Sequence, residues 1–153
     1  MQQLWDAADF VRKLRARLRF GNLSRAKLKL LRLELTGDSA ECDWIARAAD
    51  PWDRDLENVV ARRNASIQAM EDSLAVRDLL FYAVPSISEA RLQVYRQINR
   101  ADTELIIEGV VSRDEPPDRN IRSLAMRARL CGLHFWLDDG VLLAMQPETS
   151  VAG

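Results

Sequence analysis

Hydrophobic and polar residues follow two different periods along this chain, and the period changes from one segment to the next. Apolar residues spaced three and four positions apart predict helices over 3–19, 53–82 and 119–131, because that spacing gathers them on one helical face. Elsewhere apolar and polar residues alternate, which is typical of strands, where successive side chains point to opposite faces of a sheet. The strands predicted in this way are 31–35, 40–47, 91–95, 104–111, 133–137 and 141–145.

Turn and stop residues separate these elements. A Thr-Gly-Asp-Ser turn at 36–39 joins the first two strands into a hairpin, and an Asp-Asp-Gly turn at 138–140 closes another. Pro85 ends the second helix, because proline cannot continue a helix. Gly132 stops the third helix, since glycine adopts the backbone conformation that ends helices.

The order of the elements predicts an α+β fold. An N-terminal helix is followed by two related strand-strand-helix units and a closing strand, which predicts an antiparallel sheet with helices on one face. A chain of 153 residues can build one core without metal or disulfide links. We therefore expect a single domain over 1–146 and a frayed tail over 147–153.

Two short motifs occur twice in the same order. Ser-Leu-Ala-x-Arg at 73–77 returns at 123–127, and Pro-x-Asp-Arg at 51–54 returns at 116–119. Such self-similarity predicts two supersecondary units that cover each other's apolar faces. Arg77 and Arg127 are then either equivalent helix-face residues or a pair that binds an anion. The predicted repeat units are 28–84 and 90–137.

Composition favours an ordinary soluble protein, with 48% hydrophobic and 29% charged residues. No window approaches the run of about 18 apolar residues that a membrane span requires. The first residues lack the basic start and apolar run of a secretory signal, so we expect a cytoplasmic location. Cys42 and Cys131 are too few to imply a disulfide framework, and both are expected to be small buried side chains.

Charge is unevenly distributed, with nine basic and no acidic residues between Phe10 and Leu33. One interpretation is a solvated helix face followed by a charged edge strand that resists aggregation. Nucleic-acid binding is the second, because neutralising phosphates needs clustered basic residues, and an anionic membrane surface is the third. A sequence pI near 5.9 argues against dedicated nucleic-acid binding. The candidate nucleic-acid or anion contacts are Arg12, Lys13, Arg15, Arg19, Lys27 and Lys29.

The residues that carry chemistry are sparse. One histidine, His134, and two distant cysteines cannot supply a closed zinc site without several carboxylates. Alternation places His134 beside Trp136, on the face opposite Leu133 and Phe135. No glycine-rich phosphate loop and no nucleophile elbow occur in the sequence. The sequence therefore predicts no catalytic residue, no cofactor and no metal ligand.

Three functions remain as hypotheses. The first is a non-enzymatic cytoplasmic binding or assembly module that self-associates through its long second helix or an exposed sheet face. Its candidate interface residues are Trp52, Val60 and Ile67, and no small-molecule ligand is indicated. The alternative is a nucleic-acid-associated protein that uses the basic N-terminal segment. The third is an enzyme with His134 and a carboxylate in a cleft between the two repeat units.

Overall fold

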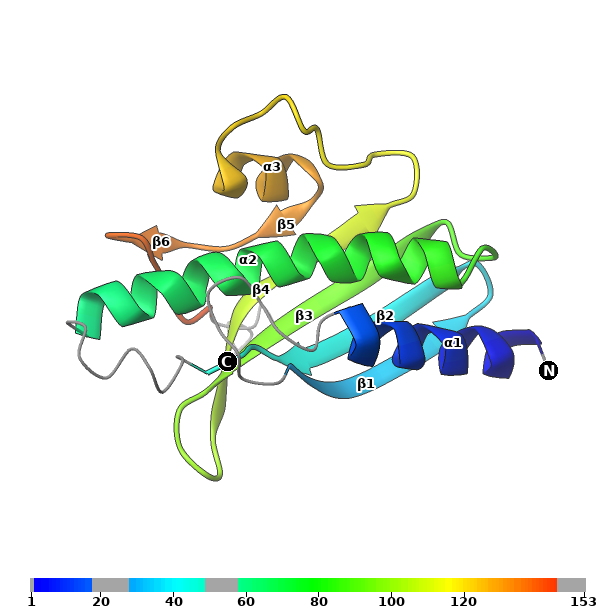
Figure 1. Cartoon of the computed structure of the whole chain (residues 1–153), viewed down its shortest axis with the longest axis horizontal. Coiled ribbons are helices and arrows are strands. Elements are labelled where there is room, and N and C mark those ends of the chain that lie inside the picture. The colour runs from blue at the N-terminus through cyan, green and yellow to red at the C-terminus, as the bar shows by residue number, and fades with distance from the viewer. Residues whose placement is uncertain (1, 18–27, 49–57, 146–153) are drawn as a thin grey trace, which may run out of the picture.

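A computed structural model describes residues 2–17, 28–48 and 58–145, and in these residues helices lie over a sheet (Figure 1). The helices are α1 (Gln2–Arg17), α2 (Asn58–Ala83) and α3 (Leu124–Leu130). The strands are β1 (Lys29–Thr36), β2 (Ser39–Ile45), β3 (Glu89–Gln97), β4 (Thr103–Ser112), β5 (Leu133–His134), β6 (Leu137–Asp138) and β7 (Val141–Leu142). The predicted α+β class is confirmed. The predicted tail over 147–153 lies outside the described residues.

The main sheet has five strands in the order β1-β2-β3-β4-β5, and β6 and β7 form a separate pair. The neighbours β1–β2 and β3–β4 are antiparallel hairpins, and β4–β5 is also antiparallel, with α3 between the two strands in sequence. The central pair, β2 and β3, is parallel. The long helix α2 crosses over between β2 and β3 and returns the chain to the end of the sheet where β2 began, so this pair is parallel and departs from the predicted antiparallel sheet. The sheet is thus mostly antiparallel.

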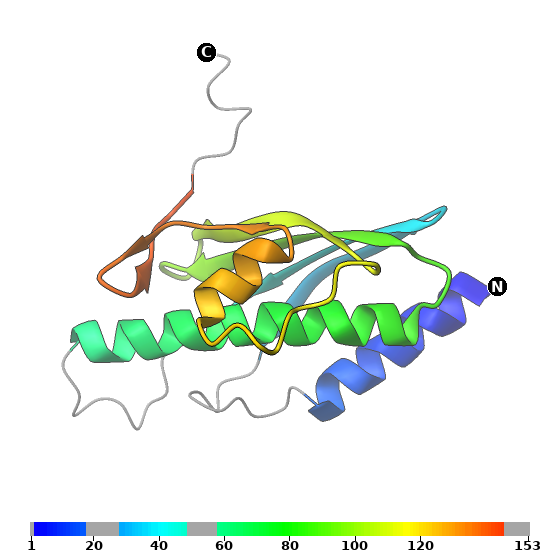
Figure 2. The same ribbon diagram turned by 90° about the horizontal axis from the view of Figure 1, so that it is seen from above.

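All three helices lie on one side of the sheet (Figure 2). The core fills the space between these layers and includes Phe10 of α1, Leu80 of α2, and Trp44 and Leu92 of the sheet, each fully buried. The two cysteines are free and buried, as predicted. Burial raises the pKa of the Cys42 thiol to about 12, so this side chain is neutral at physiological pH.

The C-terminal end of α2 is held by Arg113, which follows β4. Its guanidinium donates hydrogen bonds to the carbonyl oxygens of Phe81, Val84 and Ile87, each at 2.9 Å. The Phe81 ring also contacts the guanidinium groups of Arg77 and Arg113, at 4.7 and 5.0 Å from its centroid. Arg113 therefore donates to one carbonyl group in the last turn of α2, that of Phe81, and to two in the chain that follows the helix.

The N-terminal half of α2 packs on the β6–β7 hairpin. The backbone N–H of Leu142 donates to the Ser66 hydroxyl at 2.9 Å, and Arg63 donates to the Asp139 carbonyl at 2.7 Å. The hairpin turn contains Asp139 and Gly140 with φ of 53° and 80°. Two consecutive positive φ values match the twist of a two-residue hairpin turn, as the Asp-Asp-Gly motif predicts.

A buried ion pair ties the middle of α2 to the chain after β2. Arg47 Nε donates to Asp72 Oδ2 at 2.7 Å, and Gln68 donates to the other carboxylate oxygen at 3.0 Å. Burial raises the pKa of Asp72, and the hydrogen bond from Arg47 opposes this rise. Removing either member would break this buried ion pair, which is costly inside a protein.

The predicted third helix and fifth strand differ in extent from the observed elements. The helix begins at Leu124 instead of 119, because the Ser123 hydroxyl accepts a hydrogen bond from Met126 N at 3.2 Å and acts as the N-cap. The segment 133–137 divides into β5, which pairs with β4, and β6, which pairs with β7. A local alternation pattern cannot show where a strand changes partner.

The strand-strand-helix order occurs twice, whereas the equivalence of the two units stays a prediction. Ser123 caps a helix, but Ser73 lies within α2 and donates to the Ala69 carbonyl at 2.8 Å. Arg77 donates to the carbonyl oxygens of Ser112 and Arg113, at 2.6 and 3.2 Å. Arg77 thus donates to backbone carbonyl oxygens, and these contacts do not favour a site in which Arg77 and Arg127 bind an anion together.

None of the helices in the described residues has the length and apolar character needed to span a bilayer.

Replacing Gly109 with alanine is expected to destabilise the protein by about 3 kcal/mol, because an added methyl group overpacks a closely fitted contact. A Cβ at this position would collide with the backbone oxygen of Gly132 and lie 2.9 Å from Leu133 Cα. The β4–β5 pair would have to separate. Urea denaturation gives the free energy of unfolding that tests this.

The control is Gly37→Asn, at a turn glycine with φ of 61° and open space around its Cβ position. Asparagine tolerates this left-handed conformation, so the control should cost less than about 1 kcal/mol. Equal losses for the two variants would show that the β4–β5 contact is not tightly packed.

Candidate functional site

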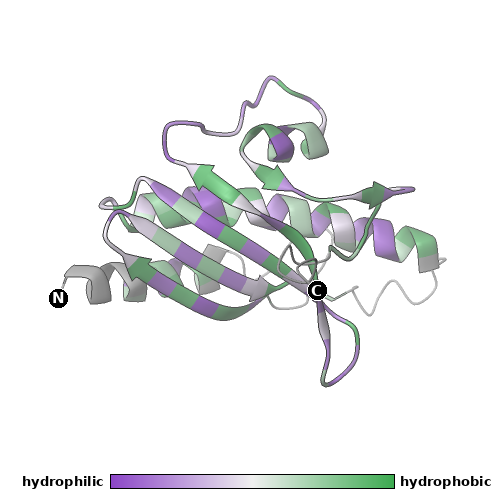
Figure 3. Cartoon of the chain, turned by 180° about the vertical axis from the view of Figure 1, so that it is seen from behind, coloured by the Kyte–Doolittle hydropathy of each residue, from purple (hydrophilic) through white to green (hydrophobic). Residues whose placement is uncertain are grey.

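The face of the sheet turned away from the helices has no helix or strand over it within the described residues (Figures 2 and 3). The strand register places a row of polar residues across it, one from each strand from β1 to β5. These are Arg32, Asp43, Gln93, Glu108 and His134. Directly paired residues point to the same side of a sheet, so these side chains share this face.

We call this surface the open face, and it includes the neighbouring residues that the same register brings to it. A second row runs parallel to the first and contains Glu34, Glu41, Arg91 and Val110. The open face consists of Arg32, Glu34, Glu41, Asp43, Arg91, Gln93, Tyr95, Glu108, Val110 and His134.

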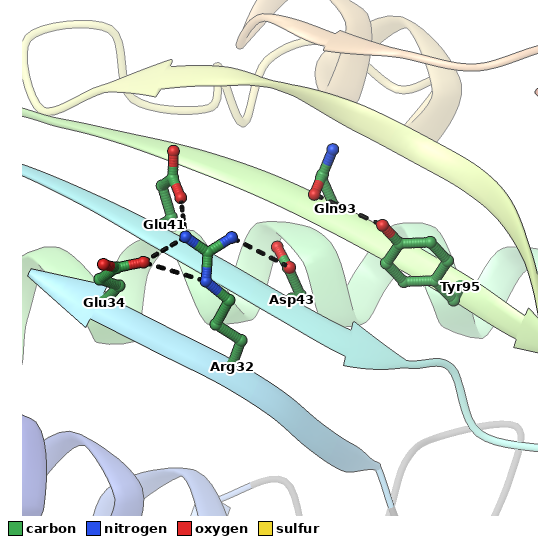
Figure 4. Close-up of polar contacts among 6 residues, drawn as sticks. All are labelled: Arg32, Glu34, Glu41, Asp43, Gln93 and Tyr95. Atoms are coloured by element: carbon green, nitrogen blue, oxygen red, sulfur yellow. Dashed lines mark hydrogen bonds and ion pairs between the residues drawn. The ribbon is translucent and has the colours of Figure 1, made fainter. Parts of the chain in front are cut away.

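Arg32 is the centre of an ion-pair cluster on the open face (Figure 4). Its guanidinium contacts the carboxylates of Glu34 and Glu41 and lies 3.8 Å from that of Asp43. The hydrogen bond to Glu34 raises the pKa of Arg32. Three carboxylates around one guanidinium fix the side-chain positions on β1 and β2, although exposed pairs of this kind add little stability.

Asp43 is the least exposed member of this cluster, with 13% of its side chain accessible. Burial raises its pKa, and the charges of Arg32 and Arg91 partly offset the rise. Beside it, burial and the charges of Asp43 and Glu108 raise the pKa of Tyr95. The Tyr95 hydroxyl therefore stays protonated and donates to Gln93 Oε1 at 3.4 Å. The cluster thus presents fixed donors and acceptors to a ligand.

Exposed apolar side chains border this polar area. Val110 is 52% exposed, and Trp136, two residues beyond His134, is 65% exposed. Phe135, between His134 and Trp136 in the sequence, is buried, and its ring centroid lies 4.7 Å from the Arg129 guanidinium of α3. As alternation predicts, His134 and Trp136 differ in burial from Leu133 and Phe135: the first two are exposed and the other two are buried.

The described part of the basic N-terminal segment is largely paired with acidic residues. Arg12 and Lys13 both contact the Asp9 carboxylate, at 3.4 and 2.9 Å. Lys13 also lies 4.1 Å from the centroid of the Tyr82 ring, which joins α1 to α2. Lys29 is exposed at the start of β1. The structure does not describe the side chains of Arg15, Arg19 and Lys27.

The candidate interface residues on the long helix are partly enclosed. Val60 and Ile67 are half-buried, and Ile67 packs against the core. Trp52 lies outside the described residues. Between positions 59 and 83 of α2, the exposed residues are Arg62, Asp78 and Tyr82. The helix thus offers a partner fewer accessible side chains than the open face does.

The described residues contain no group of three or more histidine, cysteine, aspartate or glutamate side chains that could hold a metal ion. His134 is exposed on the open face, where the register sets it opposite Glu108. The polar rows were missed at the sequence level, although alternation already placed Arg32 with Glu34 on one side of a strand. The missing information was the parallel pairing of β2 and β3, which joins the two hairpins into one surface.

Comparison of the chain with protein-family models, with curated proteins and with solved structures found no match.

Replacing Asp43 with asparagine is expected to leave stability near pH 7 unchanged or increased. The folded-state pKa of Asp43 is raised, so the folded protein binds this proton more tightly than the unfolded chain does. Ionised Asp43 therefore disfavours folding above its folded pKa, and the penalty disappears as the pH falls through that value. The asparagine side chain carries no charge, so the variant avoids the cost of burying an ionised carboxylate. Urea denaturation at about pH 7 and about pH 4 measures the effect.

The gain of the variant over the parent protein should be larger at the higher pH. Asp114→Asn, at an exposed position beyond β4, is the matched control and should show a smaller pH-dependent difference. A loss of stability at neutral pH in the Asp43 variant would show that attraction to Arg32 outweighs the cost of burial.

Proposed function

We propose that this chain is a non-enzymatic, cytoplasmic binding module that recognises another protein through its open face. The observation that carries this proposal is the polar row that five strands hold in place, with the exposed Trp136 two residues beyond its last member, His134. Tryptophan, tyrosine and arginine dominate the energetic centres of protein interfaces. The buried free cysteines accord with a reducing compartment.

The charge of the open face favours a protein partner over a nucleic acid. Its acidic residues, Glu34, Glu41, Asp43 and Glu108, outnumber its arginines, Arg32 and Arg91. Phosphate backbones bind surfaces with an excess of positive charge. A protein partner can instead match both signs and bury the apolar residues Val110 and Trp136.

Panning a random peptide phage library on the folded protein is expected to enrich peptides that bind the open face. Synthetic versions of these peptides should bind Trp136→Ala at least tenfold more weakly, which corresponds to about 1.4 kcal/mol. Fluorescence anisotropy of labelled peptides measures the affinities. Removal of Trp136 deletes the largest exposed apolar surface beside the polar row.

Leu130→Ala is the matched control, because Leu130 is 60% exposed but lies on α3, on the helical side of the sheet. The selected peptides should bind Leu130→Ala with an affinity within a factor of about two of their affinity for the parent protein, since exposed residues outside an interface contribute little. A library that yields no enriched peptide, or peptides that lose no affinity with Trp136→Ala, would exclude this proposal.

A further inference from the structure

The strand β1 forms a long, unpaired edge of the sheet in the described residues. It has eight residues and pairs with β2 on one side only. The apolar side chains at this edge are incompletely buried: Leu33 and Leu35 are half-buried, and Leu31 is 47% exposed. Unpaired N–H and C=O groups along such an edge can accept another strand.

The sequence of β1 is complementary to itself when a second copy runs antiparallel. With Leu33 at the centre, Arg32 lies opposite Glu34 of the partner subunit, and Glu34 lies opposite Arg32 of the partner subunit. Opposite charges on directly facing residues stabilise an antiparallel pair, and like charges destabilise it.

Other registers are less favourable. Centring the pair on Arg32 or on Glu34 sets like charges directly opposite each other. Centring it between two residues sets a core-facing side chain opposite one from the open face, which the pleat of a sheet does not allow. Centring it on Leu35 extends past Thr36, where β1 ends in a turn. The sequence of β1 therefore favours the register centred on Leu33.

From this we propose that two copies of the chain associate through antiparallel pairing of their β1 strands, with Leu33 on the twofold axis. The irregularity between Leu30 and Arg32 ends the regular stretch of β1, so the contact spans few residues. The surface area that it buries is small compared with the roughly 1,600 Å² of a standard interface, so we expect a dissociation constant in the micromolar range. The contact uses Arg32 and Glu34 of the open face but not Trp136, so the Trp136→Ala test of the proposed function and the β1 test of this proposal can fail separately.

Sedimentation velocity of the full chain at concentrations from about 1 to about 300 µM tests this proposal, because that range brackets a micromolar dissociation constant. The parent protein should pass from monomer to dimer. Glu34→Arg and Arg32→Glu each set like charges opposite one another and should each remain monomeric over this range. An equimolar mixture of these two variants restores both opposite-charge pairs and should dimerise.

The double variant Arg32→Glu/Glu34→Arg keeps self-complementarity and should dimerise alone, which excludes loss of folding as the cause of the single-variant results. Trp136→Ala should dimerise like the parent protein, since it lies outside the contact. Three outcomes would each overturn the proposal: a monomeric parent protein, a dimer that survives Glu34→Arg, or a variant mixture that stays monomeric.

Discussion

The C-terminal end of α2 is buried, and its last carbonyl groups must find donors inside the protein. Arg113 donates to the Phe81 carbonyl in the last turn of α2 and to the Val84 and Ile87 carbonyls just beyond it, while its guanidinium lies over the Phe81 ring. Because Arg113 directly follows β4, one side chain joins the helix between the two hairpins to the second hairpin. Together with the buried apolar side chains of α2, this contact holds the helix over the sheet.

The position of α2 determines what the other side of the sheet presents. The helix brings β2 and β3 together as parallel neighbours, and their register aligns Asp43 with Gln93 and Glu41 with Arg91. A shift of one strand by one residue would turn its side chains in these rows toward the core. Packing of α2 on one face of the sheet thus determines which polar side chains lie next to each other on the opposite face.

Features that depend on neighbouring residues could be predicted from the sequence. The hairpin at 36–39, the Asp139–Gly140 turn and the outward position of His134 follow from turn chemistry and alternation. The parallel pair and the division of 133–137 between two sheets depend on contacts between distant segments. The cluster around Arg32 was missed for a related reason, because Glu41 and Asp43 reach it across a strand pair.

The two edges of the sheet differ greatly in length. One edge is the eight-residue β1, and the other is the two-residue β5, after which the chain turns away into the β6–β7 pair. A strand added beside β5 would find almost no backbone to pair with. Pairing of two β1 strands uses the same long edge of both copies, so this contact closes on itself and does not by itself propagate into a filament.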